Sequence, residues 1–141
     1  MTIAPDGHTA ALVTSSGAII VDLRNGRIGV PMASPYGATA DVAIGLDSAV
    51  LATAGSGGVL LWDIASGRRV GVALPVAGST AVSFDGTGLN LVTGSDDGEV
   101  MVWELDPDRW VETACELAGR TLDREEWQRY LGDRPYDPAC R

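Results

Sequence analysis

The sequence predicts an all-β domain of three repeated four-stranded units, followed by a short pair of α-helices. Three observations lead to this prediction. Glycines and short apolar runs fill the chain up to Trp103, and similar segments recur there at a spacing of 41 residues. From Glu104 onward the 38 remaining residues hold only two glycines but ten of the 19 acidic residues. The expected domains are therefore residues 1–105 and residues 106–141.

The repeat can be followed by direct alignment of three segments. The segment AVLATAGSGGVLLWDIASGR at 49–68 matches AALVTSSGAIIVDLRNGR at 10–27, and GLNLVTGSDDGEVMVWELD at 88–106 repeats the alignable parts. Trp62 and Trp103 are again 41 residues apart. A constant period indicates that each copy is one supersecondary unit that stacks on its neighbours.

Within each unit the pattern favours short strands over helices. Leu89–Thr93 and Val100–Trp103 are apolar runs joined by a turn containing Asp97-Gly98, and Asp-Gly is a strong hairpin signal. Near-continuous apolar strands indicate sheets that are covered on both faces. The strands expected in the middle unit are Asp41–Ile44, Val50–Thr53, Val59–Trp62 and Val70–Leu74.

The end of the third strand carries a recurring dipeptide: Trp62-Asp63, Trp103-Glu104 and the degenerate Val21-Asp22. In these residues, and in the hairpin of residues 91–105, the chain resembles the WD-repeat β-propeller family, whose units are about 40 to 45 residues long. The resemblance covers roughly residues 1–105. It implies a partial β-propeller of about three four-stranded blades, with the first and the last incomplete.

The same resemblance implies structural roles for several side chains. In that family a hydrogen-bonded set links a Gly-His dipeptide, a Ser or Thr on the second strand, an Asp in the hairpin turn and the Trp. The histidine is missing before both complete first strands, so Asp97 is expected to find backbone N–H groups or water instead. The structural residues carried over are Thr53, Trp62, Asp63, Thr93, Asp97 and Trp103.

The number of units is too small for a closed ring of blades. The first unit has only Thr2 and Ile3 before its first turn, and no outer strand follows Trp103. Open blade faces would expose apolar surface and lower the stability of an isolated monomer. We therefore expect the C-terminal part of a larger propeller, a truncated product, or a unit that self-associates.

The tail is expected to form two helices that dock on the last blade. Trp110 and Trp127 lie on the apolar stripes of these helices and are the expected anchors. Because such short helices are unstable alone, their apolar faces need a surface to cover. The capping and stop residues are Asp106, Gly119, Asp123 with Glu126, and Gly132.

The tail from Trp110 to Cys140 also resembles the segment that follows the last blade in multidomain bacterial WD-repeat proteins. In those proteins the upstream part is often a STAND-type NTPase, a protease-like domain or a kinase. Two functional hypotheses follow. The first is a non-enzymatic protein–protein interaction module or scaffold with partners of unknown identity. The alternative is a regulatory or sensor segment of a bacterial signalling protein.

Charge and cysteine content bound the environment and the partners. A net charge of -9 argues against nucleic acid and against anionic membranes as partners. No apolar run reaches the roughly 18 residues that would cross a bilayer. Two cysteines are too few for a disulfide scaffold, which favours a reducing compartment and a cytoplasmic location.

Candidate catalytic and ligand-binding residues all have simpler interpretations. His8 is the only histidine and lies in a turn, without a nucleophile motif. The glycine-rich segment 55–58 lacks the lysine of a phosphate loop, and residues 96–99 do not have the spacing of a calcium loop. Cys115 and Cys140 could pair, but two packed free thiols are favoured. We therefore expect no catalytic, cofactor-binding or metal-binding residues, and no cofactor.

Overall fold

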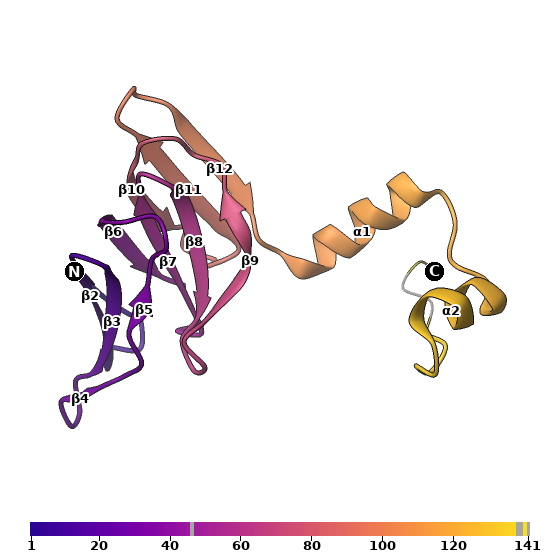
Figure 1. Ribbon diagram of the computed structural model, residues 1–141, viewed down its shortest axis with the longest axis horizontal. Coiled ribbons are helices and arrows are strands. Elements are labelled where there is room, and N and C mark those ends of the chain that lie inside the picture. The colour runs from indigo at the N-terminus through magenta and orange to yellow at the C-terminus, as the bar shows by residue number, and fades with distance from the viewer. Residues whose placement is uncertain (46, 138–139, 141) are drawn as a thin grey trace. The chain divides into compact units, whose positions relative to one another are not determined.

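A computed structural model describes residues 1–45, 47–137 and 140 (Figure 1). The chain divides into two compact units, Met1–Glu104 and Leu105–Arg141. The first contains all the strands and the second contains both helices. Each unit is described by itself below.

The first unit consists of three antiparallel sheets, which follow one another along the chain (Figure 1). In the first sheet the order is β1-β2-β3-β4, and β5 pairs with β3 beyond the end of β4. The outer strand of this sheet is therefore split into two short pieces. Its strands are β1 (Thr2–Ile3), β2 (Thr9–Thr14), β3 (Gly17–Asp22), β4 (Arg27–Ile28) and β5 (Met32–Ala33).

The second sheet has four strands and the third has three, each in sequential order. Together with the first sheet they confirm the predicted partial β-propeller with repeated four-stranded units. The second sheet contains β6 (Thr39–Ile44), β7 (Val50–Gly55), β8 (Gly58–Asp63) and β9 (Arg68–Leu74). The third contains β10 (Ser79–Phe84), β11 (Asn90–Ser95) and β12 (Val100–Glu104).

The central strands β7 and β8 of the second sheet are buried on both faces, as their continuous apolar runs predict. Alternate residues of β8 point to opposite faces, yet all four from Val59 to Trp62 are at most 8% exposed. One face packs against the first sheet in a core cluster that includes Leu60 and Trp62 from β8 and Ile20 from β3. The other face packs against β10 of the third sheet.

A hydrogen bond joins the second and third sheets directly. The backbone N–H of Val82 in β10 donates to the Asp41 carboxylate in β6 at 3.1 Å. The two residues are 41 positions apart, so this bond links nearly equivalent places in successive units. This hydrogen bond helps to set the position of β10 along β6.

Glycine closes the turn after the third strand in each of the first two sheets. Gly26 and Gly67 have φ values of 69° and 67°, in the left-handed region that glycine adopts at little cost. Their N–H groups donate to the carbonyls of Asp22 and Asp63 at 2.7 and 2.8 Å. This turn reverses the chain into the outer strand, and its recurrence explains the Asp and Gly at a constant spacing.

The second unit contains helices α1 (Pro107–Ala118) and α2 (Arg124–Leu131). Their predicted ends are confirmed: Asp106 and Asp123 are the N-caps, and Gly119 and Gly132 are the C-caps. Asp123 also forms the predicted capping box with Glu126.

The helical faces are not buried within the tail itself. Neither helix contains a buried residue, and Trp110 is 51% exposed. Trp127 is half-buried, but in a small cluster within the tail itself: its ring meets the Tyr136 ring edge-on at 5.4 Å, and its Nε1 donates to the Arg134 carbonyl at 3.0 Å. Docking of either tryptophan on the last blade stays a prediction.

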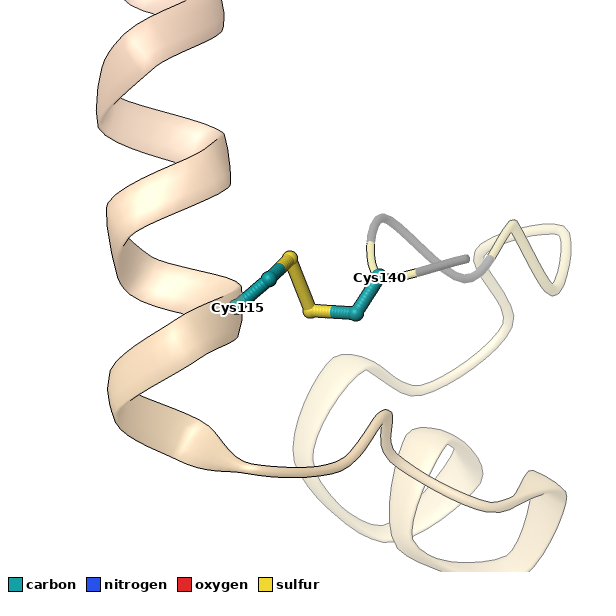
Figure 2. The surroundings of a disulfide bond; sticks show 2 residues. All are labelled: Cys115 and Cys140. Carbon is teal, nitrogen blue, oxygen red and sulfur yellow. A yellow bond between two sulfur atoms is a disulfide. The ribbon is translucent and has the colours of Figure 1, made fainter.

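A disulfide between Cys115 and Cys140 closes the tail (Figure 2). The favoured expectation of two free thiols is therefore wrong. The bond joins α1 to the end of the chain across a separation of 25 residues. Cross-linking removes conformational freedom from the unfolded chain, so it can stabilise a unit that has no buried helical residue.

We expect the tail to depend on this disulfide. Replacing both cysteines, Cys115→Ser and Cys140→Ser, should destabilise the tail by about 2–4 kcal/mol, the usual range for removing such a cross-link. Trypsin cleavage in the tail should become faster, and the helical circular-dichroism signal should fall. Unchanged cleavage with and without a dithiol reductant would show that the helices are stable by themselves.

Candidate interaction surface at the third sheet

A threonine–tryptophan hydrogen bond recurs in the second and third sheets. Nε1 of Trp62 donates to Oγ1 of Thr53, and Nε1 of Trp103 donates to Oγ1 of Thr93, both at 3.0 Å. The bond crosses from the third strand to the second and satisfies an indole N–H that would otherwise be buried without a partner. The two bonds therefore hold the hairpins of both sheets in the same register.

Asp97 lies apart from this pair, in the exposed hairpin turn between β11 and β12. Its carboxylate accepts hydrogen bonds from the Ser95 hydroxyl and from the Glu99 backbone N–H. The Ser95 hydroxyl is the main cause that lowers the pKa of Asp97 below its ordinary value. The carboxylate thus stabilises its own turn.

The Asp of the Trp-Asp dipeptide also has a turn-forming role. Asp63 accepts hydrogen bonds from both the hydroxyl and the N–H of Ser66, and the hydroxyl is the larger cause of its lowered pKa. In the first sheet the Asp22 carboxylate accepts a hydrogen bond from the Arg24 backbone N–H. The hydrogen bond from the Arg24 side chain is the main cause that lowers the pKa of Asp22 to about 2. In the third sheet Glu104 takes this place, and the chain enters α1.

Ser79 is a buried polar residue that sequence reasoning did not single out. It is 2% exposed, and its Oγ has no hydrogen-bond partner among the described residues. Ser79 begins β10 immediately after Gly78. The resemblance to WD repeats predicts a Gly-His dipeptide at this end of the strand. The missing histidine was the signal that a polar partner is lacking at this end of the sheet.

The third strand of the third sheet is exposed where its counterpart in the second sheet is buried. Trp62 pairs with Leu51 and Trp103 pairs with Leu91, so Val59–Trp62 and Val100–Trp103 are equivalent. Yet Val100 is 71% exposed and Val102 is 67% exposed. In the second sheet β9 pairs with β8, whereas β12 is the edge strand of its sheet in the part of the chain that the structure describes.

The exposed valines share one face. Val102 pairs with Val92, and Val100 pairs with Gly94, so these residues point to the same side. Met101 and Trp103 alternate with them and point to the opposite side. We call Val92, Val100 and Val102 the third-sheet face.

The other candidate residues lie in turns. His8 is exposed, and its backbone N–H donates to the Asp6 carboxylate at 2.7 Å, which is the main cause that lowers the pKa of Asp6 to about 2. Gly55–Gly58 joins β7 to β8. Among residues 1–45, 47–137 and 140, no three His, Cys, Asp or Glu side chains gather as a metal site, and no helix is long and apolar enough to cross a membrane.

One hollow of about 850 Å³ lies in the tail, beside α1 and the disulfide. It is open to solvent rather than enclosed. Small-molecule sites are usually enclosed and mostly apolar. Its lining residues are Asp106, Asp108, Arg109, Val111, Glu112, Cys115, Glu116, Gly119, Arg120, Thr121 and Cys140.

Stacked antiparallel sheets with a repeated threonine–tryptophan bond define a repeat protein of the β-propeller class. Comparison with known families makes this specific, because residues 75–104 match the family model described as WD domain, G-beta repeat. The match spans β10, β11 and β12. Residues 75–104 thus form a WD repeat, and such repeats generally mediate protein–protein interaction. A comparison with curated proteins found no match.

We expect the two threonines to contribute unequally. Thr53→Val should lower the free energy of unfolding by about 1–3 kcal/mol, because the indole N–H of Trp62 is left buried without a partner. Thr93→Val should cost less, because Trp103 is only partly buried and water can reach it. Urea unfolding of both variants measures the difference. Equal costs would mean that Trp103 is as well covered as Trp62.

Ser79→Ala should stabilise the protein by about 1 kcal/mol, because it removes a buried hydroxyl without a partner. Ser83→Ala is the matched control on the same strand; Ser83 is exposed, so the change should be within about 0.5 kcal/mol. Thermal and urea unfolding report both changes. Destabilisation by Ser79→Ala would reveal a partner for the hydroxyl in solution.

Proposed function

We propose that the protein is a non-enzymatic protein–protein interaction module that binds its partner at the third-sheet face and along the adjoining edge of β12. One observation carries this proposal. Val100 and Val102 are 71% and 67% exposed, whereas the equivalent Val59 and Leu61 in the second sheet are 0% and 8% exposed. A surface that the fold buries in one unit is open in the next.

Two properties of this surface suit a protein partner. An edge strand presents unpaired backbone N–H and C=O groups, to which another strand can add by hydrogen bonding. Exposed valines beside that edge offer an apolar contact that loses water on binding. Residues 75–104 contain five acidic and no basic residues, which disfavours a phosphate backbone at the same place.

The disulfide bears on where the protein acts. Cytosolic thiols are kept reduced, so the Cys115–Cys140 bond weighs against the predicted cytoplasmic location. The location, the membership of a larger propeller and the alternative role in a bacterial signalling protein stay predictions.

A photo-crosslinking amino acid tests the proposal in cells that express the protein. Placed at Val102, it should give a covalent adduct with a protein on irradiation. The matched control is Val72, which is 81% exposed on β9 and lies outside the third-sheet face. Mass spectrometry identifies the adduct. Equal or absent crosslinking at the two positions would contradict the proposed surface.

A further inference from the structure

The first sheet has an apolar face on which Ile3 is 55% exposed and the other large side chains are partly exposed. Ile3 pairs with Ala10, and Ala10 pairs with Val21, so these side chains point to one side. Leu12 and Ile19 form the next pair on that side, because they are two residues along each strand. Ala11, Ala18 and Ile20 alternate with them and belong to the core against the second sheet. We call Ile3, Leu12, Ile19 and Val21 the first-sheet face.

This face is equivalent to one that the second sheet buries. Ile3 corresponds to Ile44, because Ile44 pairs with Leu51 and Leu51 pairs with Trp62 in the same pattern. Ile44 is 7% exposed and packs in the core against the first sheet, whereas Ile3 is 55% exposed. The first-sheet face is therefore the counterpart of the face with which the second sheet contacts the preceding sheet.

The third-sheet face is the complementary half of such a contact. Its valines correspond to Val59 and Leu61, which lie on the side of the second sheet that faces β10. The chain therefore forms the same kind of junction twice, between the first and second sheets and between the second and third. Among the described residues, the first-sheet face and the third-sheet face are the two halves of such a junction that no other sheet covers.

We propose that a second copy of this chain docks head to tail, with the third-sheet face of one copy against the first-sheet face of the next. This inference rests on the proposed function and names the partner at that surface. The contact is heterologous, since two different patches of the same chain meet, and it can therefore extend to further copies or close a ring.

The contact between copies lacks the hydrogen bond that joins the second and third sheets. Asp41 accepts the Val82 N–H between the second and third sheets, but the place equivalent to Asp41 in the third sheet is occupied by Ala81, which has no acceptor side chain. Each copy also has a net charge of -9, so the copies repel one another. Added salt screens this repulsion and leaves the apolar contact in place.

Sedimentation of the purified full chain at increasing concentration tests the proposal. We expect the mass to rise above the 14.6 kDa of one chain, and to rise at lower protein concentration when sodium chloride is added. Val102→Glu removes one half of the contact and Ile3→Glu removes the other. Each variant alone should sediment as a monomer. Mixed together they should form a dimer, because each retains the half that the other lacks.

Val72→Glu is the matched control, since it adds the same charge at an exposed valine outside both faces, and it should associate like the parent chain. Circular dichroism checks that each variant is folded, and Val100→Glu replaces Val102→Glu if that variant is not. A parent chain that stays monomeric at every concentration overturns the proposal. So does a mixture that stays monomeric, or association that persists in Ile3→Glu.

The crosslink at position 102 separates this inference from the proposed function. An adduct with a second copy supports both. An adduct with a different protein supports the interaction module and overturns the self-docking. A link to the tail of the same chain shows that the tail covers this face, and overturns both proposals.

Discussion

Burial of both faces of the second sheet is the interaction on which the rest of the sheet unit depends. The central strands β7 and β8 are apolar at nearly every residue and cannot leave either face in water, so the sheet requires a neighbour on each side. The first and third sheets provide those neighbours through the core around Trp62 and through β10. Each neighbour then has an outer face of its own, and the open surfaces of this protein follow directly from that geometry.

The tail is stabilised by other interactions than the sheets. Its helices have well-formed caps but bury no residue. The hydrophobic effect that stabilises the sheets therefore contributes little there. A covalent link, the Trp127–Tyr136 contact and an ion pair between Arg120 and Glu126 take its place. The two units thus depend on different chemistry and should respond to different conditions.

Much of the sheet unit could be predicted from the sequence, because its signals are local and repeated. The period of 41 residues, the Asp-Gly turn and the apolar runs gave strands that match β7, β8 and β12 to within a few residues. The helix ends were also predictable, since a cap depends on a few neighbouring residues. The pairing of Cys115 with Cys140 and the exposure of Trp110 were not, because both depend on how distant segments meet.

The candidate surface shows the same division. The lack of an outer strand after Trp103 is visible in the sequence, whereas the exposed alternation of Val100 and Val102 requires the register of β12 against β11. The unpartnered hydroxyl of Ser79 likewise required knowledge of its burial. Sequence pattern locates an open end, and only the pairing of the strands tells which side chains are on which face.

The two-sided burial of the second sheet also sets the order in which the sheet unit opens. In a linear stack each sheet is stabilised by its nearest neighbours, so the middle sheet has two supports and each terminal sheet has one. Local opening should therefore begin at the outermost strands and then reach the middle sheet. The amides of β7 and β8 would then exchange with solvent last, and the outer faces of the first and third sheets would belong to the most mobile part of the sheet unit.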